Sequence, residues 1–209
     1  MVAFGKLGIF SVGVDMSPHL VAAGNNEIRK NNLLSKAYLV IGNAVAIPMS
    51  PGIFDCVTIL GNTFSLLERE EGRLLLAEAK RLLCSNGVVI MDIPAAHHAV
   101  ASLPPGRCET CRKIKTESLG EVEVIWIREL DLGSKSIRSR ETYTFLDGKA
   151  RKQVKSVTFA FRLYDPEEIM VMASQMGLQA ARLMEYTDDS GRYVGMLRRR
   201  LFLILKRQT

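Results

Sequence analysis

The chain has 209 residues, of which 47% are hydrophobic and 24% are charged, a balance typical of a globular protein with a substantial core. No apolar run reaches the length of a membrane span, and the N-terminus lacks the basic-then-apolar order of a secretory signal, so we expect a cytoplasmic protein without a membrane partner. The net charge of +6 is modest and its basic residues form no single tract, so a nucleic-acid partner is not expected.

The N-terminal segment predicts a strand that ends at an acidic residue. Residues 1–7 have the pattern of a helix tail, with Gly8 as its C′ residue, and residues 9–14 then form a strand that runs into Asp15. Open α/β sheets bind a ribose through an aspartate at the carboxyl end of such a strand. Carboxylates are common at strand ends, so position alone leaves a purely structural role open.

A helix and a second strand follow this aspartate. Ser17 and Pro18 suit the N-cap and first position of a helix over residues 18–31. A strand over residues 37–41 leads into the turn 42–44. The packing residues expected on the helix are Leu20, Val21, Ala23 and Ile28.

The middle of the chain predicts a further strand–helix–strand unit. Residues 54–60 form a nearly continuous apolar run, as expected of a buried parallel strand, and residues 61–62 follow at its carboxyl end. Residues 70–84 then predict an amphipathic helix, and residues 88–93 another buried strand. The apolar face expected on that helix comprises Leu74, Leu75, Ala79, Leu82 and Leu83.

From about residue 108 the pattern changes to long segments rich in β-branched and aromatic residues. Strands are predicted over residues 121–132, 135–146 and 149–164, and Asp147-Gly148 is a strong hairpin turn signal between the last two. We therefore expect an antiparallel β insert over about residues 108–164.

The C-terminal segment returns to the α/β pattern. A capping box opens a helix over residues 165–177, and two strands, 178–186 and 196–206, are joined by a polar turn at 188–191. The sequence predicts an α/β fold: a mostly parallel, Rossmann-like sheet with an antiparallel C-terminal strand pair and an antiparallel β insert, all in one domain.

Only one pair of the four cysteines has metal-ligand spacing. Cys108 and Cys111 form a CxxC motif, but a structural zinc site needs a second pair or suitable histidines, which His97 and His98 could supply. The other two cysteines lie in apolar segments and are expected in the core. We predict no metal site.

Several strand-end motifs, taken in order, resemble those of the class I S-adenosylmethionine-dependent methyltransferases. The resemblance covers essentially the whole chain and is closest to the glycine N-methyltransferase-like, small-molecule subgroup, which has an antiparallel insert after the fifth strand. The motifs that carry it are Gly13–Pro18, Gly42–Ala44, Phe54–Val57, Gly61–Asn62, Gly87–Ile90, Arg162–Glu168 and Gly177–Leu178.

The resemblance implies S-adenosyl-L-methionine as cofactor and assigns roles to residues at the strand ends. Asp15 would accept hydrogen bonds from both ribose hydroxyls, and Met16 would pack near the adenine. Asn43 and Ala44 would border the adenine; the family usually has Asp at position 43, where Asn can still accept a hydrogen bond, although Gly-Asn is also a common turn. The residues implied beside the methionine portion are Gly61 and Asn62.

Methyl transfer from a sulfonium needs mainly proximity and orientation, sometimes with a base. His97 and His98 follow the fifth strand and are candidate bases, since histidine has a near-neutral pKa; the alternative is a pair of ordinary loop histidines. Arg162 could hold a substrate carboxylate, or could be a strand-surface residue.

The sequence also departs from the family. The first strand and its glycine-rich loop normally precede the ribose-binding acid by about twenty residues, whereas only fourteen residues precede Asp15. The strands over 9–14 and 54–60 would then each lack a neighbour in mid-sheet, so they pair with each other or the gap is filled from elsewhere. Because Met1 falls within a helix, we expect a chain truncated before Met1.

Three functions follow. The first is a methyltransferase acting on a nitrogen or oxygen of a small molecule. The second is a non-catalytic methyltransferase-like subunit, in which a homo-oligomer or partner subunit completes the sheet. The third is an RNA methyltransferase, suggested by the sequence pI of about 9.3.

Overall fold

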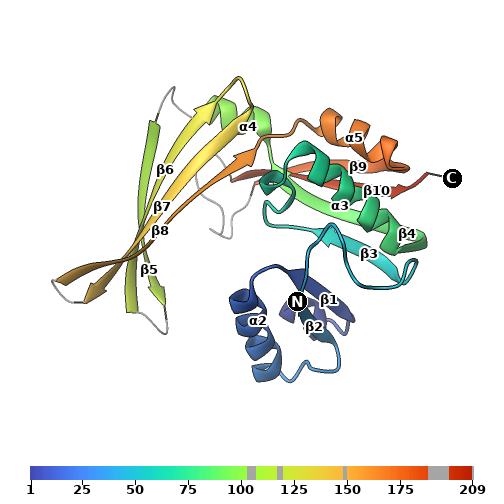
Figure 1. The fold of residues 1–209 in the computed structure, drawn as a ribbon, viewed down its shortest axis with the longest axis horizontal. Coiled ribbons are helices and arrows are strands. Elements are labelled where there is room, and N and C mark those ends of the chain that lie inside the picture. The colour runs from blue at the N-terminus through green and yellow to red at the C-terminus, as the bar shows by residue number, and fades with distance from the viewer. Residues whose placement is uncertain (103–106, 117–119, 148–149, 188–197, 209) are drawn as a thin grey trace.

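The chain folds into three β-sheets that share no backbone pairing in the part of the chain that the structure describes. The computed structural model describes residues 1–102, 107–116, 120–147, 150–187 and 198–208. The strand orders are β1-β2, β3-β4-β10-β9 and β5-β6-β7-β8. Figure 1 shows them as an N-terminal unit in blue, a central α/β unit and a projecting meander.

The N-terminal unit consists of α1 (Val2–Lys6), β1 (Ser11–Asp15), α2 (Pro18–Lys30) and β2 (Ala37–Ile41). Gly8 ends α1 with a φ of 78°, and the amide of Ile9 donates to the carbonyl of Phe4 at 3.0 Å, as expected of a C′ glycine. Strands β1 and β2 are parallel, with Asp15 opposite Ile41. The predicted elements of this unit are confirmed to within two residues.

Helix α2 packs closely on β2 but buries only a narrow stripe. A Cβ added at Gly24 would lie 2.2 Å from Leu39 Cδ1, so the glycine permits this approach. Val21 and Ile28 are buried as predicted, whereas the prediction for Leu20 and Ala23 is wrong, because both are exposed. A two-stranded sheet is too narrow to cover the rest of the helix.

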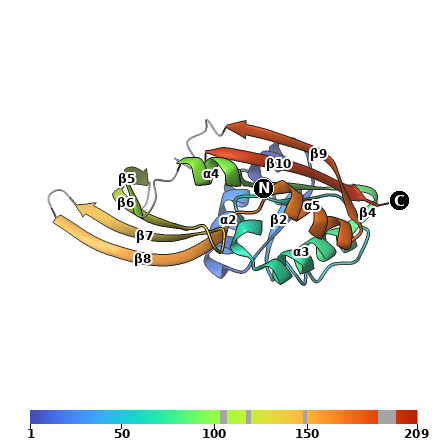
Figure 2. The ribbon, with the colours of Figure 1, turned by 90° about the horizontal axis from the view of Figure 1, so that it is seen from above.

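The central unit is a four-stranded sheet with helices on one face. Strand β3 is parallel to β4, and β10 is antiparallel to both β4 and β9, so the predicted C-terminal antiparallel pair is confirmed. Helices α3 and α5 cover one face of the sheet (Figure 2). The elements are β3 (Phe54–Ile59), η1 (Phe64–Leu66), α3 (Arg69–Leu82), β4 (Leu83–Pro94), α5 (Pro166–Gln175), β9 (Leu178–Thr187) and β10 (Arg199–Arg207).

Two predictions for this unit are wrong in detail. The apolar face predicted for α3 is wrong at one position: Leu74 is 48% exposed and Leu76 is buried instead. The other four predicted residues are buried, namely Leu75, Ala79, Leu82 and Leu83. Strand β3 is parallel, but half of its residues are exposed, since it pairs on one side only in the described part of the chain. Cys56, expected in the core, is one of the exposed residues. Cys84 is only partly buried.

Helix α5 begins with the capping box that the sequence predicts. The Asp165 side chain accepts from the backbone of Glu168, whose own carboxylate accepts from the Asp165 amide at 3.1 Å. The helix stops before Gly177, which has a φ of 74°. The polar turn expected at 188–191 lies outside the described residues.

The facing edges of β1 and β3 remain unpaired within the described residues. Strand β1 pairs only with β2, and β3 only with β4. Of the two outcomes expected from the sequence, direct pairing of these strands is therefore wrong. The N-terminal unit lies beside the β3 edge without extending its sheet (Figure 1).

The segment between β2 and β3, residues 42–53, connects the N-terminal unit to the central one, and we call it the tether. The Glu78 carboxylate of α3 accepts from the Ile47 amide at 2.7 Å, and Arg81 donates to the carbonyls of Ile47 and Met49 at 2.9 and 2.8 Å. Ala44 and Val45 pack against the core of the central unit. The segment between β2 and β3 is thus held by one turn of α3.

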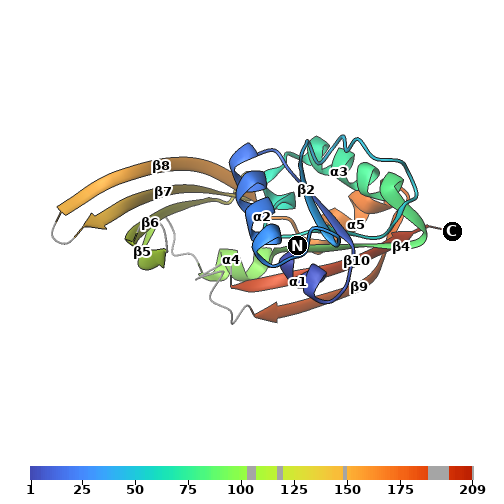
Figure 3. The same ribbon diagram turned by 90° about the horizontal axis from the view of Figure 1, so that it is seen from below.

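The β insert is a four-stranded antiparallel meander that projects from the central unit (Figures 1 and 3). Its base packs on α4 (Ala96–Ser102), where Ala96 and Ala99 contact Ile137 and Phe161. The insert predicted over 108–164 is confirmed, although β5 was not predicted as a separate strand, and the second residue of the Asp147-Gly148 turn lies outside the described residues. The strands are β5 (Arg107–Thr116), β6 (Gly120–Asp131), β7 (Ser136–Asp147) and β8 (Ala150–Arg162).

No helix in the described ranges is long and apolar enough to cross a membrane. Whether residues 1–209 behave as a single domain stays a prediction.

Candidate functional site

The first part of the candidate site is the carboxyl end of β1. Asp15 is partly buried, and its Oδ1 accepts from the Ser17 amide at 2.8 Å, which fixes the carboxylate at the start of α2. Its Oδ2 has no hydrogen-bond partner among the described residues, so one oxygen remains available as an acceptor. Met16 follows as an apolar side chain with 71% of its surface exposed.

The second part is the turn after β2, which the parallel register brings beside Asp15. The amide of Gly42 donates to the Asp15 carbonyl at 3.1 Å. Asn43 is exposed, and its side-chain oxygen accepts from the Val45 amide at 3.1 Å. This contact is that of a turn residue. Among the described residues the Asn43 amide nitrogen and a second oxygen lone pair have no partner, so both can bind a ligand.

The third part is the carboxyl end of β3. Gly61 and Asn62 both have left-handed backbones, with φ of 73° and 70°, which a residue other than glycine adopts only at some cost. The Asn62 side-chain oxygen accepts from Arg200 Nη1 at 2.6 Å. Asn62 is therefore held by a buried arginine, and its amide nitrogen has no hydrogen-bond partner among the described residues.

A buried ion pair supports this strand end. Arg200 Nε donates to Asp92 Oδ1 at 2.9 Å, with side-chain exposures of 0% and 6%. The other carboxylate oxygen of Asp92 lies 3.5 Å from the Gly61 amide, and the Tyr186 hydroxyl donates to Oδ1 at 3.3 Å. Burial, together with the nearby Asp92 charge, raises the pKa of Tyr186.

Sequence reasoning missed Asp92, Arg200 and Tyr186. One signal was present: Arg200 opens the apolar run of the last strand, and Asp92 interrupts the apolar run of residues 88–93. Their pairing joins residues 108 positions apart, which no local pattern reveals.

The predicted histidines and Arg162 lie elsewhere. His97 Nε2 lies 3.5 Å from Glu185 Oε2 on β9, and His98 contacts Ser102 within α4. Arg162 Nη1 lies 3.7 Å from the Glu68 carboxylate, and its guanidinium lies over the Tyr164 ring. These contacts account for the three side chains structurally, so their catalytic and substrate-binding roles remain predictions.

Comparison with known proteins shows which fold this geometry shares. Residues 3–87 match the family model described as "Methyltransferase domain". No curated protein sequence gives a significant match. The chain has the class I S-adenosylmethionine-dependent methyltransferase fold.

Solved methyltransferases share this fold at low sequence identity. An S-adenosylmethionine-dependent methyltransferase from Clostridium acetobutylicum is 17% identical, with a TM-score of 0.74 over 96% of this chain and 76% of its own. The CcbJ methyltransferase from Streptomyces caelestis is 16% identical, with a TM-score of 0.76 over 99% of this chain and 78% of its own. The amino pentose methyltransferase CalS10 from Micromonospora echinaspora, solved with bound SAM, is 17% identical. Its TM-score is 0.66 over 95% of this chain and 74% of its own.

The CxxC motif of this methyltransferase fold cannot hold one metal ion through both thiols. Cys108 and Cys111 lie three residues apart on β5, and an odd separation on a strand places side chains on opposite faces. Among the described residues there is no group of three or more potential metal ligands.

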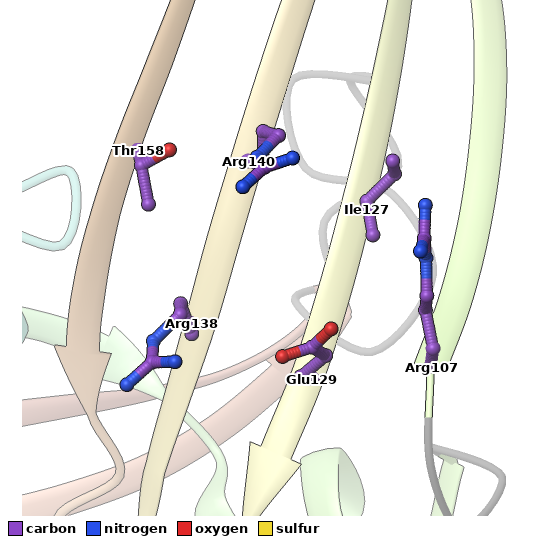
Figure 4. Close-up of a pocket in the computed structure, with 6 residues that line it drawn as sticks. All are labelled: Arg107, Ile127, Glu129, Arg138, Arg140 and Thr158. Atoms are coloured by element: carbon purple, nitrogen blue, oxygen red, sulfur yellow. The ribbon is translucent and has the colours of Figure 1, made fainter.

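The meander carries a shallow hollow lined by three arginines. Figure 4 shows Arg107, Arg138 and Arg140 on one face of the sheet, around Glu129 of β6. Its volume is about 190 Å³, with Ile127 and Thr158 completing the lining. None of the three guanidiniums makes an ion pair with another described residue. We call this surface the arginine hollow.

Proposed function

We propose that this chain binds S-adenosyl-L-methionine at the carboxyl ends of β1, β2 and β3 and acts as a methyltransferase on a small molecule. The observation that carries the proposal is the free Oδ2 of Asp15, held beside the β2 turn by the Ser17 amide. A carboxylate acceptor at a parallel strand end is suited to the two hydroxyls of a ribose. When bound, the cofactor supplies the activated methyl group.

The residues present fit this cofactor in part. Met16 offers an exposed apolar surface for the adenine, and Asn43 retains donor and acceptor capacity beside it. Asn62, fixed by Arg200, offers its amide nitrogen toward the methionine portion. The chain's own contribution would be to orient the ribose and the methionine end and so set the direction of the methyl group.

The small-molecule assignment is supported by the neighbours. CalS10 is described as an amino pentose methyltransferase, a small-molecule enzyme of the same fold. The acceptor atom, nitrogen or oxygen, belongs to the proposal.

Calorimetric titration with S-adenosylhomocysteine tests the cofactor site. We expect saturable binding by residues 1–209, weakened at least about tenfold by Asp15→Ala, which removes a charged hydrogen-bond acceptor. Asp55→Ala is the matched control, because Asp55 lies near the opposite end of a neighbouring strand and should leave binding unchanged. Equal affinities for the two variants would contradict the assigned site.

A second function, a non-catalytic or partner-completed subunit, is favoured by one observation. The unpaired edges of β1 and β3 leave the middle of the cofactor site without a backbone in the described residues. A strand from a second molecule would complete both ladders. Absence of S-adenosylhomocysteine binding by the monomer, with binding in an oligomeric fraction separated by gel filtration, would support this function over the first.

A further inference from the structure

Arg128 is a buried cation without a hydrogen-bond or ion-pair partner among the described residues. Its surface is 7% exposed, its Nε is fully buried, and none of its nitrogens has a hydrogen bond or a carboxylate within 4.0 Å among the described residues. Burial lowers the pKa of its guanidinium, although arginine remains protonated at any physiological pH. An unpaired buried charge is costly, so a structure that keeps one usually provides for a partner.

A second unsatisfied polar group lies directly beside it. Ser139 of β7 is opposite Arg128 of β6 in the sheet register, is 0% exposed, and its hydroxyl has no hydrogen-bond partner. Both side chains share the face that carries Ile137, which packs on α4. We call this the α4 face of the meander; the arginine hollow lies on the other face (Figure 4).

The next row of the α4 face is half-open and contains an aromatic platform. The Arg128 guanidinium lies 6.0 Å from the centre of the Trp126 ring. Glu141, opposite Trp126, is a carboxylate whose charge acts on the Arg128 guanidinium, but it accepts from the Tyr143 hydroxyl at 2.6 Å instead of pairing with Arg128. Glu141, Trp126 and Tyr143 are partly exposed, so a ligand can approach along this row.

We propose that Arg128 and Ser139 form a binding site for an oxyanion, carried by the molecule that occupies the α4 face of the meander. The geometry provides guanidinium and hydroxyl donors side by side with no protein acceptor. A carboxylate or a phosphate supplies paired oxygen acceptors that match the planar guanidinium. The inference extends the proposed function: the oxyanion is part of the methyl acceptor.

The only tryptophan in the chain reports on this site. Trp126 lies against Arg128, so its fluorescence should change as the oxyanion binds. We would titrate the full chain with sodium phosphate and, separately, with sodium acetate, at ionic strength held constant with sodium chloride. A saturable change is expected with at least one anion, and comparison of the two separates phosphate from carboxylate recognition.

Arg128→Met should weaken the anion response at least about tenfold, because the charged donors are lost. Arg138→Met is the matched control, since it removes an equal charge from the opposite face of the same sheet. Loss of the response in Arg138→Met with retention in Arg128→Met would assign the anion to the arginine hollow and overturn the proposal. No saturable change with either anion in the unmodified chain would also overturn it.

Ser139→Ala provides a second variant if Arg128→Met does not fold. It removes the buried hydroxyl with little change in volume, and should weaken anion binding at least about threefold without lowering the melting temperature. An unchanged anion affinity in Ser139→Ala would exclude Ser139 as an anion ligand and overturn the proposed site of Arg128 and Ser139. The S-adenosylhomocysteine titration is independent of these measurements: anion binding without cofactor binding would refute the proposed function alone, and the reverse result would refute this inference alone.

Discussion

The buried pair of Arg200 and Asp92 makes a quantitative prediction. Replacement of Arg200 by Met keeps most of the side-chain volume but leaves Asp92, 6% exposed, without its cation. Breaking a buried pair by removing one partner costs roughly 3–5 kcal/mol of unfolding free energy. For a chain of this size that corresponds to a fall in melting temperature of roughly 6–20 °C.

The adjacent residue on the same strand is a matched control. Arg199 also pairs with a carboxylate, Glu185 at 3.0 Å, but the two side chains are 51% and 34% exposed. Because exposed ion pairs contribute roughly 0–1 kcal/mol, Arg199→Met should be nearly neutral.

Urea denaturation followed by far-ultraviolet circular dichroism measures both variants. The reasoning would be refuted if Arg200→Met lay within about 0.5 kcal/mol of Arg199→Met, the range of an ordinary surface substitution. Asp92→Leu combined with Arg200→Met should recover at least half of the loss, since an apolar pair of similar volume needs no compensating charge.

Three further predictions concern other parts of the fold. The hydrogen bond from Arg81 lowers the pKa of Glu78 below its ordinary value of 4.5, so this carboxylate stabilises the tether above that pH, and the contribution is lost as the pH falls through the lowered pKa. The protection factor against hydrogen exchange around residue 47, corrected for the intrinsic exchange rate at each pH, should fall at acid pH in the native chain but stay constant in Glu78→Gln. Burial, assisted by Glu141, raises the pKa of Tyr143 to about 12, and ultraviolet titration should show a late-ionising tyrosine whose pKa falls in Glu141→Gln. Gly24→Ala should destabilise the N-terminal unit by about 1–3 kcal/mol, although alanine is the better helix former, because its Cβ would meet Leu39; a stabilised variant would contradict this packing.

Features determined by neighbouring residues were predictable from the sequence. The capping box at Asp165 and the bounds of β2 depend on interactions within a few positions, and both are found as expected. The position of Asp15 at a strand end follows from the same local logic.

Features determined by distant partners were not predictable. An apolar run such as residues 54–59 indicates a strand but not how many neighbours the strand has. Half of β3 is exposed because it has one neighbour, β4, among the described residues. Likewise, Asp92 in a strand pattern gives no indication that Arg200 neutralises it. The sequence therefore identified the strand ends, and the structure adds the buried Arg200–Asp92 pair that holds the Asn62 side chain.

The unpaired edge of β3 also bears on the behaviour of the chain in concentrated solution. Parallel strands with free N–H and C=O groups template the addition of further strands, and proteins usually cover such edges or protect them with charges. Along β3 the protection is slight: Asp55 is its single charged residue, followed by Cys-Val-Thr-Ile. The same edge that would accept a completing strand therefore makes the isolated chain prone to edge-to-edge aggregation.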